Sequence, residues 1–190
     1  MAKKVLFFVL LVMLLIPQLA RSEGAKPIQL AIFDPIQLVP ENESIGGLSL
    51  SLIYGANQDV SGISLGLINR TKGRGVGLQY GAVNITEGDF TGLQWGFVNW
   101  SEGFMHGLQY GALNVSKGQS AGVELGLVNY SKDSFSGFQG GVVNYAGEMH
   151  GLQFGFVNYT KSLDGLQIGL ANYNGNKKPL EFMVLVNWSF

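Results

Sequence analysis

The chain has no cysteine among its 190 residues, and only 13% of its residues are charged. Without cysteine, disulfide bonds, thiolate metal sites and cysteine nucleophiles are excluded, as is the lipid-modified cysteine of bacterial lipoproteins. The formal net charge of −1 provides no basic footprint for nucleic acid, so we expect no nucleic-acid partner. With 46% hydrophobic residues and 28 glycines, the chain is nevertheless too apolar for a disordered protein.

The first 22 residues have the order of features found in secretory signal peptides. Two lysines precede the apolar run 5–16, and Ala20-Arg21-Ser22 offers small residues at the −3 and −1 positions of a cleavage site. Twelve apolar residues span only about 18 Å as a helix, which is too short for a bilayer. We therefore expect a cleaved signal peptide at 1–22, an N-terminal segment with a possible first strand at 23–46, and a repeat β domain at 47–190.

A repeat of fifteen residues dominates the rest of the chain. Each unit is close to G-L-Q-aromatic-G-apolar-V-N-x-S/T-x-G, as in residues 92–103. Its asparagine recurs in steps of fifteen, with two steps of fourteen near the end, and paired glycines four residues apart precede it. Such a period predicts that each unit contacts its sequence neighbours. We single out these structural repeat residues: Gly77, Gly81, Asn84, Gly92, Gly96, Asn99, Gly107, Gly111, Asn114, Gly122, Gly126 and Asn129.

The unit predicts extended chain. Two glycines per unit would each cost about 1 kcal/mol in a helix, and β-branched and aromatic residues fill the remaining positions. The pattern alternates with period two, so Leu93, Trp95 and Phe97 share one face, and Gln94 and Val98 share the other with the glycines.

Two all-β architectures accommodate this unit. The first is an antiparallel up-and-down meander, closed as an outer-membrane β-barrel of about 10–12 strands. Antiparallel pairing of Tyr80 with Trp95 places the hairpin turn on the polar pair Glu87-Gly88, as a tight turn requires. The second is a parallel β-solenoid with one repeat per coil and stacked Asn and Gln ladders. Its narrow core would crowd Trp95 and Phe97 or leave them exposed, so the barrel is our main prediction and the solenoid the alternative.

The C-terminal strand, 180–190, favours the barrel. Apolar residues alternate from Phe182 to the final Phe190, and this end resembles the terminal strand of bacterial outer-membrane barrels. The resemblance implies that Trp188 and Phe190 form an assembly signal for the barrel-assembly machinery, with outer-membrane lipid as the second partner. The alternative is a buried closing strand of a soluble sheet.

The repeat region as a whole, residues 47–173, resembles bacterial surface-repeat proteins of the leptospiral type, which carry G-x-Q-x-G-x-x-N units. That resemblance implies a surface or cell-envelope location and no established activity.

Catalytic and metal-binding arrangements do not recur in the sequence. His106 and His150 occupy the same repeat position three units apart, which predicts two separate surface histidines, and Glu124 replaces the usual glutamine without a partnered acid. We therefore expect a non-enzymatic protein, with no cofactor and no metal, exported to the outer membrane or cell surface. The main functional prediction is a barrel with a structural or pore-like role. The alternative is a secreted or surface-displayed solenoid that binds a protein or glycan partner along its flat Gln/Gly face.

Overall fold

The structure is a computed structural model that describes residues 24–177 and 179–190. The predicted signal peptide lies outside these residues. None of the described residues forms a helix that is long and apolar enough to cross a membrane. The described chain forms twelve strands: β1 (Lys26–Phe33), β2 (Ile36–Gln37), β3 (Ile45–Asn57), β4 (Val60–Thr71), β5 (Gly75–Tyr80), β6 (Val83–Thr86), β7 (Phe90–Trp95), β8 (Val98–Ser101), β9 (Met105–Tyr110), β10 (Leu113–Ser116), β11 (Ser120–Asn174) and β12 (Phe182–Ser189).

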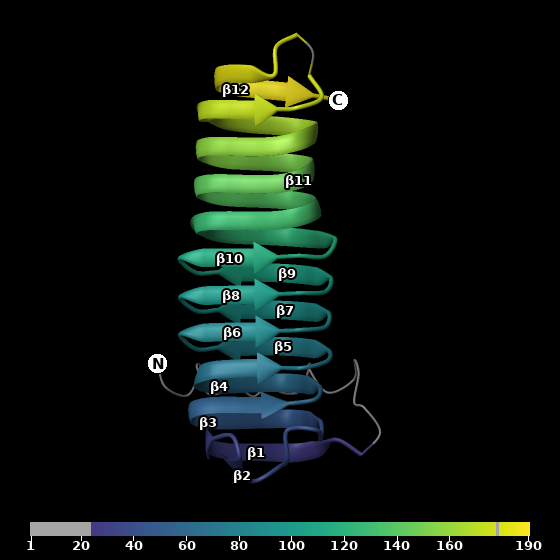
Figure 1. Cartoon of the computed structure of the whole chain (residues 1–190), viewed down its shortest axis with the longest axis vertical. Coiled ribbons are helices and arrows are strands. Elements are labelled where there is room, and N and C mark those ends of the chain that lie inside the picture. Colours follow the sequence, from purple (N-terminus) through teal and green to yellow (C-terminus); the bar gives the residue numbers. More distant parts are fainter. Residues whose placement is uncertain (1–23, 178) are drawn as a thin grey trace, which may run out of the picture.

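From β3 to β11 the chain winds into a parallel β-solenoid with one repeat per coil (Figure 1). Each coil has a strand segment that carries the repeat's glutamine, as in β5, β7 and β9, and a second one that carries its asparagine, as in β6, β8 and β10. Residues pair with the residue fifteen positions later, so Gln79 lies opposite Gln94 and Asn84 opposite Asn99. The predicted all-β class and the solenoid alternative are therefore confirmed.

The main prediction, an antiparallel meander closed as a barrel, is wrong. Tyr80 does lie opposite Trp95, but the two strands are parallel, and Glu87-Gly88 links one coil to the next. The antiparallel register would have placed Gln79 opposite Gly96. The parallel register instead stacks identical side chains, and amide side chains gain most from such stacking because each can hydrogen-bond to its own copy.

Amide ladders fill the interior of the solenoid. Gln94 Nε2 donates to Gln79 Oε1 over 2.7 Å, and this bond points toward the N-terminal end. Asn84 Nδ2 donates in the opposite direction, to Asn99 Oδ1 over 2.9 Å and to the carbonyl of Trp95 over 3.1 Å. Asn84 is thus paired both with its copy in the next coil and with the backbone around it. Most of the large buried apolar side chains form one discontinuous column: Ile45, Val60, Phe90, Met105, Phe135, Met149 and Leu163.

Close stacking of the coils leaves no room for a Cβ atom at either glycine of a unit, and the first glycine also has a positive φ. Gly92 has a φ of +140°, and a Cβ atom there would lie 2.0 Å from the carbonyl oxygen of Gly77 in the preceding coil. Only glycine combines this backbone conformation with this approach of two chains.

The two ends of the solenoid are covered differently. At the N-terminal end, β1 pairs in parallel with β3, and β2 pairs antiparallel with β1. The Asn57 side chain lies within hydrogen-bonding distance of the carbonyl oxygens of Val39, Pro40 and Glu43, which attaches the β2–β3 connection to the first coil.

At the C-terminal end the chain reverses, and β12 pairs antiparallel with the last part of β11. Asn187 of β12 donates to Gln167 Oε1 over 3.1 Å, so it extends the glutamine ladder by one rung. Trp188 is 51% exposed and Phe190 is 95% exposed, so the alternative of a buried closing strand does not describe these two aromatic residues.

Candidate functional site

The solenoid has two edges of opposite character. At one edge, turns such as 87–89 and 102–104 connect each coil to the next, and the arrowheads of β6, β8 and β10 point to it in Figure 1. At the other edge, a glycine such as Gly96 turns the chain between the two strands of one coil. We call these the charged edge and the apolar edge. Within residues 75–174 every Asp, Glu, Lys and Arg lies in the coil-to-coil turns of the charged edge, except the buried Glu124 and Asp164, which lies just after such a turn.

The apolar edge consists of two columns of side chains that flank the corner glycines. The column before the glycines contains Leu65, Tyr80, Trp95, Tyr110, Leu125, Gly140, Phe154 and Ile168. The column after them contains Leu67, Ala82, Phe97, Ala112, Leu127, Val142, Phe156 and Leu170. No residue in either column carries a charge or a side-chain amide, and the only polar side-chain groups are the tyrosine hydroxyls and the indole N–H of Trp95.

The large residues of the apolar edge are held in order although they are exposed. Trp95 contacts Tyr80 and Tyr110 edge-on, with ring centroids 5.8 and 5.4 Å apart. Trp95 is 49% exposed and Phe97 is 69% exposed. Because the backbone bonds between coils set their spacing, these side chains form a preordered surface.

Large and small residues alternate along part of this edge. Backbone bonds run from Phe97 N to the carbonyl of Ala82 and from Ala112 N to the carbonyl of Phe97, so the three residues are direct neighbours in one column. Phe97 therefore projects between two alanines. The alanines and their corner glycines lie in a groove of about 670 Å³, which Tyr80 and Tyr110 also line. A second apolar groove, of about 950 Å³, extends the edge toward β1 and β2.

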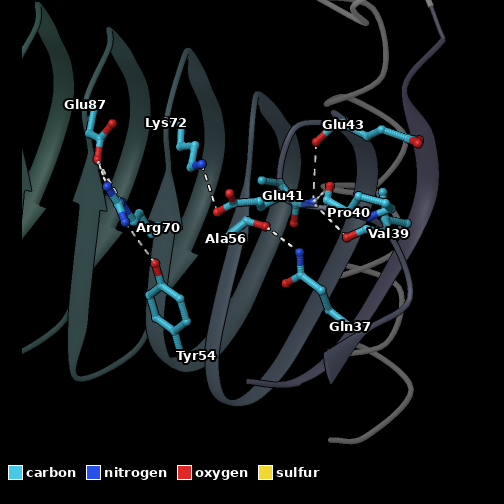
Figure 2. A network of polar contacts seen from close by, with 11 residues as sticks. Gln37, Val39, Pro40, Glu41, Glu43, Tyr54, Ala56, Arg70, Lys72 and Glu87 are labelled. Carbon is cyan, nitrogen blue, oxygen red and sulfur yellow. Dashed lines mark hydrogen bonds and ion pairs between the residues drawn. The ribbon is translucent and has the colours of Figure 1, made fainter. Parts of the chain in front are cut away.

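The charged edge is held by ion pairs between successive coils. Lys117 Nζ lies 2.9 Å from Glu102 Oε1, and 4.6 Å from the centre of the Trp100 ring. A hydrogen bond from Lys117 lowers the pKa of Glu102, and a hydrogen bond from Trp100 lowers it further by a smaller amount. Nearer the N-terminal end, hydrogen bonds to Tyr54 and Glu87 raise the pKa of Arg70, and Figure 2 shows its guanidinium between these two side chains.

Glu124 is a carboxyl group inside the glutamine ladder. It is fully buried, and it accepts hydrogen bonds from Ser116, Ser131 and Gln139. Burial raises its pKa to about 7, although these three partners act in the other direction. These three hydrogen-bond partners are all uncharged, so none of them provides a positive charge to balance an ionised carboxylate at Glu124.

The structure brings the predicted repeat residues together in columns. Gly77, Gly92, Gly107 and Gly122 stack at the positive-φ position. The remaining ones form the corner column (Gly81, Gly96, Gly111 and Gly126) and the asparagine ladder (Asn84, Asn99, Asn114 and Asn129). The Gln/Gly face does not exist as an outer surface, because Gln79, Gln94 and Gln109 are at most 2% exposed. The predicted binding face therefore needs correction: on these strands the glutamines face inward, and the exposed side chains beside the corner glycines, such as Trp95, are apolar. Trp188 lies on β12, which pairs with the last coil, and Phe190 directly follows that strand.

The two histidines lie apart. His150 Nδ1 lies 3.3 Å from Asp164 Oδ2, and the His106 ring stacks on Phe104 with centroids 5.9 Å apart. Within 24–177 and 179–190, no three His, Cys, Asp or Glu side chains are grouped as a metal site.

The apolar edge was missed in the sequence because Trp95 and Phe97 were assigned to one continuous strand. The signal that could have found it is the placement of charge, since each run from the first glycine to the asparagine lacks exposed charged residues. Comparison of the chain with protein-family models, with curated proteins and with solved structures gave no match.

Proposed function

We propose that this protein is an exported, non-enzymatic β-solenoid, secreted or displayed at the cell surface, that binds a partner through its apolar edge. Export and the lack of catalysis remain as predicted from the sequence. The binding surface differs from that prediction, because it is the apolar edge rather than the Gln/Gly face.

One observation carries the proposal: one edge of the solenoid presents a continuous apolar surface without charged side chains, and the exposed charged side chains of residues 75–174 lie at or near the opposite edge. With about half of each large side chain accessible, the apolar edge exposes on the order of 1,000 Å², against roughly 300–600 Å² for the largest apolar patch of a typical monomer. Apolar patches of this size mark protein or membrane contact sites in soluble proteins.

The edge is also rigid before it binds. Its aromatic side chains are fixed by backbone ladders and by ring contacts, so little conformational entropy remains to be lost on association. Aromatic residues of this kind carry much of the binding energy in protein interfaces.

The first test compares the two edges in the protein purified after export. Retention on phenyl-agarose and fluorescence of 1-anilinonaphthalene-8-sulfonate report accessible apolar surface. A variant with Leu67→Ser, Phe97→Ser, Leu127→Ser and Phe156→Ser should lose most of both signals and keep its circular dichroism spectrum. The matched control is Phe104→Ser on the charged edge, where one exposed phenylalanine is replaced and the signals should stay near those of the parent protein.

Location is tested separately. An epitope placed after Gln119 on the charged edge should be accessible to antibody on intact cells or in the culture supernatant. Recovery of the folded, unprocessed protein in the cytoplasm would contradict the proposal.

A further inference from the structure

We infer that the partner of the apolar edge is a second copy of this chain, bound antiparallel about a twofold axis perpendicular to the solenoid. This inference rests on the proposed function, because it names the partner of the same edge.

The geometry follows from the order of large and small residues. A twofold axis that passes between the Phe97 coil and the Ala112 coil places each column of the edge against the same column of the second copy, running in the opposite direction. Phe97 then faces Ala112, and Ala112 faces Phe97 of the other copy. One coil farther out, Leu127 faces Ala82. In the other column Leu65 faces Gly140, so a large residue again meets a small one there. Tyr80 faces Leu125 and Leu67 faces Val142, so the match of large with small is strongest at the centre of the column that contains Phe97.

The centre of this interface is aromatic. Trp95 faces Tyr110 in the column before the corner glycines, where the two rings already stand in an ordered edge-on series. Buried Trp and Tyr at the middle of an interface are the residues that most often dominate its binding energy.

The alternation distinguishes a second copy from a fluid apolar surface. The free energy of insertion into lipid depends on the total apolar area that is buried, and it does not depend on the order of large and small residues. A protein partner must instead match the relief of the groove at Ala82 and Ala112. The exposed area agrees with this assignment, since an edge of on the order of 1,000 Å² exceeds the roughly 800 Å² per partner of a standard stable interface.

Charge does not oppose this arrangement. The charged edges of both copies point away from the contact, and no charged residue of either column would be buried. The interface therefore avoids the desolvation cost of unpaired charges.

The test exchanges the large and small residues of the central contact. Sedimentation equilibrium on the exported protein, without detergent, should give twice the monomer mass. Phe97→Ala should weaken the dimer by about 30-fold for each of its two equivalent contacts, so on the order of 1,000-fold in all. Ala112→Phe should abolish the dimer, because two phenylalanines then meet. The double variant with Phe97→Ala and Ala112→Phe should restore it to within about 10-fold of the parent.

Phe104→Ala, which removes an exposed phenylalanine from the charged edge, is the control and should leave the dimer unchanged. Circular dichroism confirms folding, and all the exchanged positions point outward. A parent protein that remains monomeric, or a double variant no more dimeric than Ala112→Phe alone, would overturn the inference.

Failure of the inference and failure of the proposed function give different results. A monomer that binds phosphatidylcholine vesicles in proportion to the apolar area of its edge refutes the second copy and keeps the edge as a binding surface. If the parent protein is a monomer, and if variants of its apolar edge are retained on phenyl-agarose as strongly as the parent, then both the second copy and the edge as a binding surface are refuted.

Discussion

The interior and the apolar edge invert the usual arrangement of a soluble protein. Inside, Gln94 and Asn99 are fully buried and polar; at the edge, Trp95 and Phe97 are apolar and about half exposed or more. Burying a polar group is costly unless it is hydrogen-bonded, and here each amide finds its partner one coil away. The fold therefore depends on the exact repetition of the buried amide side chains. The exposed side chains of the apolar edge are not needed for these ladders, so they can serve to bind a partner. The two regions should therefore respond very differently to substitution.

The largest effect is expected where the coils approach most closely. Gly92→Ala places a methyl group 2.0 Å from the Gly77 carbonyl oxygen on a backbone with φ of +140°. Because backbone on both sides must move, we expect a loss of about 4 kcal/mol or more in the free energy of unfolding, or no folded protein. Urea unfolding followed by circular dichroism measures this loss.

Gly24→Ala is the control for that substitution. Gly24 also has a positive φ, of +84°, but a Cβ atom there would have nothing within 4 Å. Its cost should stay near about 1 kcal/mol. Equal losses at the two positions would show that coil spacing does not limit stability.

The next effect tests the asparagine ladder. Asn99 Nδ2 donates to the Tyr110 carbonyl over 3.0 Å and to Asn114 Oδ1 over 2.9 Å. Asn99→Ala removes these bonds and leaves a buried acceptor on the neighbouring rung without its donor. We expect a loss of about 3–4 kcal/mol, from several buried groups at about 1 kcal/mol or more each. Asn176→Ala, at an exposed asparagine outside the ladder, should change stability by less than about 0.5 kcal/mol, and urea titrations of the two variants give the comparison.

Glu124 makes the interior sensitive to pH. Its pKa is about 7 in the folded protein and near 4.5 when unfolded, so between these values the folded state holds a proton that the unfolded state has released. Stability is therefore highest below about pH 4.5 with respect to this group, falls as the pH rises to about 7, and is level above that. The loss is on the order of 3 kcal/mol.

Glu124→Gln should remove that dependence. A glutamine continues the ladder, since its amide can donate to Gln109 as the other rungs do, and the variant should be more stable than the parent at pH 8 but similar at pH 4. Glu148→Gln, at an exposed carboxylate, is the matched control. Chemical unfolding across the pH range measures the difference, and a parent protein with a flat profile from pH 5 to 7 would show that Glu124 is not protonated there.

The contrast between interior and edge also explains how far the sequence could lead. The fifteen-residue period and the extended strands follow from spacing alone. The direction of pairing, and with it the ladder of Asn84 and Asn99, does not follow from spacing, because the same pattern fits a hairpin centred on Glu87-Gly88. The inside could not be assigned from hydropathy either. Trp95 and Phe97 are too large for the narrow core of a solenoid, and they lie outside it. Their size does not favour a barrel, however, because paired amides rather than apolar residues fill most of that core.

The smallest effect is expected at the edge itself. Leu163 and Leu170 belong to the same coil, but Leu163 is 5% exposed inside the solenoid and Leu170 is 57% exposed on the apolar edge, outside the central contact. Leu163→Ala leaves a cavity and should cost about 2–3 kcal/mol. Leu170→Ala removes contacts that water can replace, and we expect a change within about 0.5 kcal/mol. Urea unfolding of this pair measures how independent the two regions are. A loss at Leu170 as large as that at Leu163 would mean that the edge supports the fold, and its apolar residues would then need no partner to account for them.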